Sequence, residues 1–101
     1  MSVQLDIKLD EKIEKKLAEP PMYKVILLND NVTPIEFVIE LLKQVFRHTD
    51  KTAEQITLSI HNEGSGVAGV YNYEIAEMKA VEATNLSRAS GFPLSIKVEV
   101  E

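Results

Sequence analysis

The sequence predicts a small single-domain α+β fold, in which a three-stranded antiparallel sheet and three helices follow one another in the order β-α-α-β-α-β. The chain has 101 residues, which suffices for one modest hydrophobic core. Segments that alternate with a strand period are separated by segments with helix-start and helix-stop signals. Short strands separated by capped helices pack most simply as one sheet with the helices on one face.

The first strand and the first helix are predicted from adjoining patterns. Residues 22–28 are rich in apolar and β-branched side chains and end at a run of turn-forming residues. A capping-box pattern that includes a proline starts at Thr33 and predicts that a helix begins there, ending near Arg47 or His48. Apolar residues recur through this helix at steps of three and four: Phe37, Val38, Leu41, Leu42, Val45 and Phe46.

The next segment carries conflicting signals. A second capping-box pattern covers residues 52–55, whereas residues 56–60 alternate like a half-buried strand. The hydrophobic periodicity alone favours neither a helix nor a strand in this segment. The capping box and the stop at Gly64 favour a short helix over residues 53–62.

The last three elements follow in order. Residues 67–71 are predicted to form the second strand, and Asn72 caps a third helix that stops at Gly91. Residues 94–100 alternate in hydrophobicity after Pro93 and predict the closing strand.

The first residues differ from this core, which is expected to cover residues 21–101. Residues 1–20 carry many charges of both signs and lead into a pair of prolines, so we expect a flexible N-terminal extension. Apolar residues alternate within it, and a docked edge strand is therefore the alternative.

Composition excludes several classes of function. The chain has no cysteine, which removes disulfides, thiol catalysis and thiolate metal sites. Its net charge of -5 argues against a nucleic-acid partner. Without an apolar run long enough to span a membrane or an export signal, we expect a cytoplasmic protein, or a stromal one if a plastid transit peptide has been removed.

Few residues suggest a chemical site. Asn29, Asp30 and Asn31 lie between a strand end and a helix start, where side chains are held but accessible, although such a cluster also makes an ordinary turn. His61 and His48 share no metal-binding motif, so we expect no metal and no cofactor. No serine stands in a strained strand-to-helix turn, so no catalytic nucleophile is predicted and the chain is not expected to be an enzyme.

The order of these motifs resembles one known family. Residues 22–31 and 32–38 strongly resemble the start of the ClpS adaptor core, and three further segments match in register, Ile60-His61, residues 69–79 and Pro93-Leu94. The resemblance covers about residues 20–101 and is far more specific than one short pattern. It implies a non-catalytic, monomeric adaptor that binds proteins by an N-terminal Leu, Phe, Tyr or Trp and delivers them to a Clp AAA+ unfoldase of the ClpA or ClpC type.

The resemblance also implies where the substrate's α-amino group binds. It assigns this role to Asn29, His61 and an acidic pair, which in this chain is Asp30 and Asn31. Because the second acid is missing, either Asp30 supplies the negative charge or neutral acceptors hold the ammonium group.

A hydrophobic pocket and a docking surface are implied in the same way. The pocket maps to Leu28, Thr33, Ile35, Val38, Thr57, Ile60 and Leu94. The family usually has methionine at positions 35 and 57, so the selectivity of this pocket is expected to differ unless the two changes compensate in volume. Glu74 and Lys79 match the contacts with the N-terminal domain of the unfoldase, and an ordinary solvated charge pair is the alternative.

A structural module and a small hydrolase are the two alternatives to an adaptor. A purely structural module, such as the similar α+β domain of the ribosomal stalk protein, would have no reason to direct Asn29 and His61 at an apolar cavity. A small hydrolase that uses His61 with an acid would cleave reporter esters or peptides.

Overall fold

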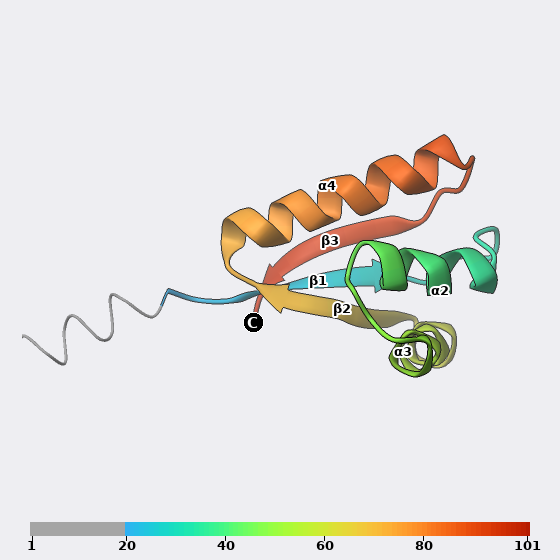
Figure 1. Cartoon of the computed structure of the whole chain (residues 1–101), viewed down its shortest axis with the longest axis horizontal. Coiled ribbons are helices and arrows are strands. Elements are labelled where there is room, and N and C mark those ends of the chain that lie inside the picture. Colours follow the sequence, from blue (N-terminus) through green and yellow to red (C-terminus); the bar gives the residue numbers. More distant parts are fainter. Residues whose placement is uncertain (1–19) are drawn as a thin grey trace, which may run out of the picture.

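The computed structural model describes residues 20–101, so the predicted N-terminal extension lies outside the described residues except for Pro20. The elements are β1 (Tyr23–Leu28), α2 (Ile35–Gln44), α3 (Asp50–Glu63), β2 (Ser65–Tyr71), α4 (Tyr73–Ala89) and β3 (Ser95–Val100) (Figure 1). The predicted α+β fold and its element order are confirmed. None of the helices within this part of the chain is long and apolar enough to cross a membrane.

The central strand of the sheet is β1, which pairs antiparallel with β2 on one side and β3 on the other. The register between β1 and β2 shifts after Val25, where β2 contains one additional residue, Ala68. A bulged residue of this kind lies outside the regular ladder. His48 Nε2 lies 2.5 Å from the Ala68 carbonyl oxygen and donates to it, which gives this histidine a structural role.

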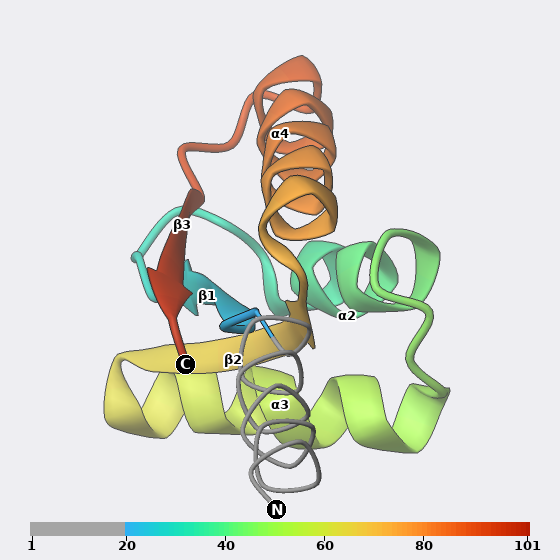
Figure 2. The ribbon, with the colours of Figure 1, turned by 90° about the vertical axis from the view of Figure 1, so that its left-hand side faces the viewer.

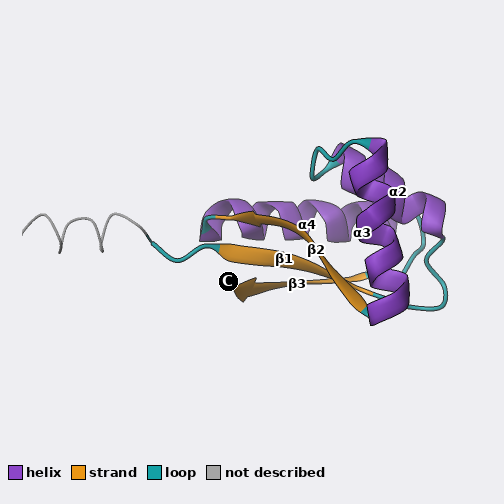
Figure 3. Cartoon of the chain, turned by 90° about the horizontal axis from the view of Figure 1, so that it is seen from below, coloured by secondary structure: helices purple, strands orange, loops and turns teal. Residues whose placement is uncertain are grey.

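The core lies between the sheet and α4, which runs across one face of the sheet (Figures 1 and 3). Ala76, Ala80 and Ala83 lie on the buried side of α4, and β1 contributes Val25 and Leu27, both fully buried. Small side chains let a helix approach a sheet closely, so this alanine face positions α4. Burial of a side chain such as Leu27 contributes about 1.5 to 3 kcal/mol.

The other two helices pack against each other beside the sheet (Figure 2). Val38, Leu41 and Leu42 of α2 join the same hydrophobic core. α3 lies so close to β2 that a Cβ added to Gly66 would be 2.7 Å from Ile60 Cγ1. The absence of a side chain at Gly66 therefore sets how closely α3 approaches β2.

The start of α2 differs from the sequence prediction. The N-cap is Pro34 instead of Thr33, the first helical residue is Ile35, and no side chain caps the helix. The hydroxyl of Thr33 donates to Asp30 Oδ2 at 2.8 Å, so it takes part in the preceding turn. The predicted end was also too late, because α2 ends at Gln44.

The ambiguous segment forms a helix, and the strand alternative is wrong. α3 covers Asp50–Glu63 and begins three residues before the predicted start, because Thr49 is its N-cap and Thr49 Oγ1 accepts a hydrogen bond from the Thr52 amide at 3.2 Å. Gly64 ends the helix in the left-handed conformation, with a φ of 91°, as predicted.

The predicted ends of α4 are confirmed. Asn72 Oδ1 accepts a hydrogen bond from the Ile75 amide at 3.0 Å and caps the first turn. At the other end Gly91 has a φ of 82°, and the Phe92 amide donates to the Ser87 carbonyl at 2.8 Å. This is the arrangement of a Schellman motif, which directs the chain back toward β3.

Candidate functional site

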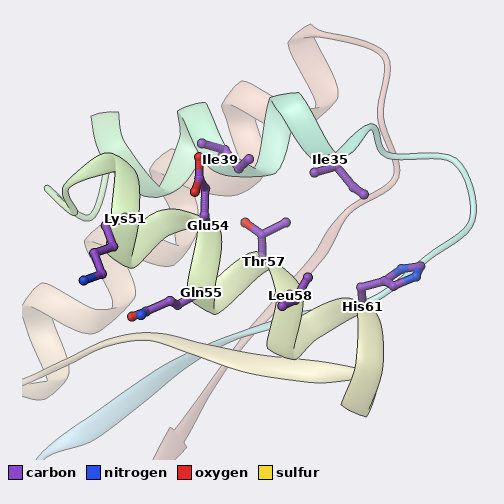
Figure 4. Close-up of a pocket in the computed structure, with 8 residues that line it drawn as sticks. All are labelled: Ile35, Ile39, Lys51, Glu54, Gln55, Thr57, Leu58 and His61. Carbon is purple, nitrogen blue, oxygen red and sulfur yellow. The ribbon is translucent and has the colours of Figure 1, made fainter.

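A cleft of about 530 Å³ lies between α2 and α3. Figure 4 shows His61 and Ile35 at one end, Thr57 and Leu58 in the middle, and Lys51 and Gln55 at the other end. The complete lining is Ile35, Ile39, Lys51, Glu54, Gln55, Thr57, Leu58 and His61. Aliphatic side chains with polar groups placed at the ends are typical of a site that binds an apolar group in a fixed orientation.

Of the predicted amine acceptors, His61 lines one end of this cleft, and the backbone of Asn29 is bonded close to the same end of α3. The Asn29 amide donates to the Gly64 carbonyl at 2.9 Å, which fastens the loop after β1 to the end of α3. His61 is in the last turn of α3, three residues before Gly64, and both His61 and Asn29 are exposed. Within residues 20–101, no cluster of His, Asp and Glu side chains suited to a metal ion occurs.

Asp30 shapes the loop that carries Asn29. Its Oδ1 accepts hydrogen bonds from the amides of Val32 at 2.8 Å and Thr33 at 2.6 Å, and its Oδ2 accepts from the Thr33 hydroxyl. Partial burial raises the pKa of the Asp30 carboxyl, but the hydrogen bonds from Thr33 and Val32, with the nearby charge of Arg88, outweigh burial and lower that pKa. Asp30 therefore keeps its negative charge beside the exposed Asn31 while its oxygens are engaged in the turn.

The predicted pocket residues fall into two groups. Ile35 and Thr57 line the cleft, and Ile35 is 50% exposed at its mouth. Val38, Ile60 and Leu94 do not line the open cleft but lie buried in the adjoining core. The remaining two predicted residues, Leu28 and Thr33, are half-buried.

Thr57 leaves the middle of the cleft open. Its hydroxyl donates to the Ala53 carbonyl at 2.7 Å, within α3. The polar atom is therefore satisfied internally, and the side chain contributes a small surface to the middle of the cleft (Figure 4). No bulky side chain at this position divides the Ile35 end from the far end.

Five lining residues were not predicted: Ile39, Lys51, Glu54, Gln55 and Leu58. Their spacing carries a signal, because Ile39 is four residues after Ile35 and Glu54 is four residues before Leu58. Residues at this spacing share one face of a helix. If the sequence had identified α3 clearly as a helix, its spacing would have predicted that Glu54 and Leu58 lie near Thr57.

The start of α4 carries the two predicted docking residues. Glu74 is exposed in the first turn of α4, which follows the end of β2 that lies away from α3 (Figure 1). Lys79 is half-buried, and its Nζ donates to the Val45 carbonyl at 2.6 Å, beside the Tyr71 ring. The alternative of a solvated charge pair is therefore wrong for Lys79, whose ammonium group binds the C-terminal end of α2.

A small α+β domain with an apolar cleft and acceptors at one end has the features of a peptide-binding module. The family model for ATP-dependent Clp protease adaptor protein ClpS matches residues 18–97. This chain belongs to the ClpS family, as the motifs in its sequence predicted.

Individual relatives agree with this assignment over most of the chain. An ATP-dependent Clp protease adapter protein ClpS from Campylobacter jejuni is 48% identical over 88 residues, which are 87% of this chain and 92% of the relative. The adapter protein ClpS 2 of Agrobacterium fabrum is 45% identical over 97 residues, which are 96% and 94% of the two chains. The solved structure of Agrobacterium tumefaciens ClpS2 bound to L-phenylalaninamide has a TM-score of 0.79 and 47% identity, and it covers 82% of this chain and 100% of that chain.

Proposed function

We propose that this protein is a non-catalytic adaptor that binds other proteins by a bulky hydrophobic N-terminal residue and delivers them to a Clp AAA+ unfoldase. The observation that carries the proposal is the apolar cleft between α2 and α3, with His61 at one end and the Asn29 backbone bonded to Gly64, three residues further along the chain. The related Agrobacterium tumefaciens ClpS2 was solved with L-phenylalaninamide, a molecule with a free amino group and an aromatic side chain. The expected first residues are Leu, Phe, Tyr and Trp.

The polar end suits the α-amino group of a substrate. An ammonium group has three hydrogen-bond donors, and the side-chain oxygen of Asn29 and an unprotonated ring nitrogen of His61 are acceptors. Asp30 already accepts three hydrogen bonds within its own loop. Asn29, His61 and Asn31 therefore supply direct contacts, while Asp30 contributes the negative charge that favours an ammonium group nearby.

The first side chain occupies the apolar part of the cleft. Ile35 and Thr57 contact it at the surface, and the buried Val38, Ile60 and Leu94 form the adjoining core. Leu28 and Thr33 complete the loop side of the pocket. Burial of a large aliphatic or aromatic side chain here contributes about 1.5 to 3 kcal/mol, which favours bulky first residues.

Delivery uses a second surface. The exposed Glu74, with Lys79 on the same helix, contacts the N-terminal domain of an unfoldase of the ClpA or ClpC type. Residues 1–20 act as the extension that the unfoldase engages, and residues 21–101 form the core domain. The adaptor acts as a monomer in the cytoplasm.

Peptides that differ only in the first residue and in N-terminal acetylation test the proposal. A Phe-starting peptide should bind, and its acetylated form should lose about 2 to 4 kcal/mol of binding free energy, because a charge-assisted contact is lost and the acceptors that the bound peptide shields from water remain unpaired. Isothermal titration calorimetry measures both. Equal affinity for the two forms would contradict the proposal, and a structural module would bind neither.

A further inference from the structure

The cleft continues beyond the region that the first residue's ring is expected to occupy. Past Thr57 it is lined by Ile39 and reaches Glu54. His61 and Glu54 both line the cleft and stand nearly two turns apart on α3, which corresponds to roughly 10 Å along the helix axis. The His61 and Glu54 side chains both line the cleft, so this separation suits a tyrosine with its amino nitrogen at His61 and its hydroxyl at Glu54.

The far end presents an available hydrogen-bond acceptor. In Figure 4 the side chain of Glu54 extends from α3 toward Ile39 of α2, across the cleft. Glu54 is exposed and belongs to none of the ion pairs formed within residues 20–101. An ionised carboxylate accepts hydrogen bonds and donates none, so its partner must be a donor.

We propose that Glu54 accepts a hydrogen bond from the hydroxyl of an N-terminal tyrosine, so that this protein binds tyrosine in preference to phenylalanine. The inference rests on the proposed function, because the amino group must bind at Asn29 and His61. The ring then lies over Thr57, whose small side chain leaves the way to Glu54 open.

The charges at this end favour a neutral donor over a cation. Lys51 lines the same end of the cleft as Glu54, and Gln55 lies beside it. The positive charge of Lys51 opposes an N-terminal lysine or arginine whose side chain reaches the same place. A phenol hydroxyl has no net charge and donates one hydrogen bond, which matches Glu54.

The test is the ratio of affinities for two peptides that differ only in a first residue of Tyr or Phe. In the unmodified protein the ratio should favour Tyr by roughly five- to tenfold, the effect of one hydrogen bond to a partly exposed carboxylate. Glu54→Ala should bring the ratio to about one, because only the Tyr-starting peptide loses a hydrogen bond. Glu63→Ala is the matched control, because Glu63 is an exposed acid of the same helix that does not line this cleft.

A second substitution tests the path between the two ends. Thr57→Met places a long side chain between His61 and Glu54, so in this background Glu54→Ala should no longer change the Tyr to Phe ratio. Equal ratios in the unmodified protein and in Glu54→Ala would overturn the inference while the proposed function stands, as would tighter binding of a Lys-starting peptide than of the Tyr-starting one. Failure of both aromatic peptides to bind the unmodified protein would overturn the proposed function itself.

Discussion

The cleft between α2 and α3 and the start of α4 carry the two proposed interactions, and they are built in different ways. The cleft joins residues from a loop and two helices, and its polar end depends on the contact between the Asn29 amide and the Gly64 carbonyl. At the start of α4, Glu74 and Lys79 lie on consecutive turns of one helix. The cleft therefore depends on tertiary packing, whereas the α4 surface is mainly a product of local structure.

One contact connects the two regions. Lys79 Nζ donates to the carbonyl of Val45, the C-cap of α2, and α2 forms one side of the cleft. A basic group at the C-terminal end of a helix interacts favourably with the helix dipole. Substitutions at Lys79 are therefore expected to affect both regions, while substitutions at Glu74 separate them.

The largest expected effect separates peptide binding from delivery. His61→Ala removes an acceptor for the ammonium group and should weaken the binding of a Phe-starting peptide by about 10- to 100-fold, since hydrogen bonds to charged groups contribute about 1.5 to 3 kcal/mol. Glu74→Lys should keep that affinity and reduce unfoldase-dependent degradation of a Phe-starting substrate. Fluorescence anisotropy and a degradation assay measure the two. Loss of peptide binding in Glu74→Lys would contradict the separation.

The contact between the regions should contribute to stability. Lys79→Met keeps the aliphatic part of the side chain but leaves the Val45 carbonyl without its charged donor, which should lower the free energy of unfolding by about 1 to 2 kcal/mol. Urea denaturation measures the change. Glu74→Gln serves as the control and should change the value by less than about 0.5 kcal/mol. Equal stabilities of the two variants would show that Lys79 does not hold α2.

The loop at the polar end should make stability depend on pH. The hydrogen bonds from Thr33 and Val32 lower the pKa of Asp30 in the folded protein, so its contribution is complete above the unfolded pKa of about 3.9 and is lost as the pH falls through the lower folded pKa. Asp30→Asn should cost about 0.5 to 1.5 kcal/mol at neutral pH and reduce the loss of stability between pH 5 and pH 2. Parallel curves for the two proteins would contradict this role.

The smallest expected effect concerns the middle of the cleft. Thr57→Met adds apolar contacts beside Ile35 and should improve the binding of a Leu-starting peptide by about 0.5 to 1 kcal/mol, with little change for a Val-starting one. Competition titrations with the two peptides measure the difference. An equal gain for both would show that position 57 does not discriminate by side-chain shape.

The fold was largely predictable because its signals are local. Asn72 and Gly64 mark helix ends through side-chain and backbone geometry that the adjoining sequence contains. The capping boxes misplaced the helix starts: Thr33 belongs to the turn that Asp30 holds, so Pro34 is the N-cap of α2, and Thr49 caps α3 by accepting from the Thr52 amide. A capping pattern shows which residues are able to cap and leaves open which of several acceptors does so.

The site was predictable in part. The resemblance placed Ile35, Thr57 and His61 where the cleft has them, but it did not predict Glu54 or the bond from Lys79 to Val45. Both depend on how helices pack. Lys79 and Val45 are 34 positions apart, and no local pattern predicts such a contact.

Nuclear magnetic resonance tests the central claim, that the cleft binds the free N-terminal residue. In an 15N-labelled sample titrated with L-phenylalaninamide, amide shifts should change around Asn29, Thr57 and His61 and remain unchanged around Glu74. Acetylated phenylalaninamide, which lacks the ammonium group, should produce almost no change at the same concentrations. Equal changes with both compounds, or changes centred on the start of α4, would contradict the account.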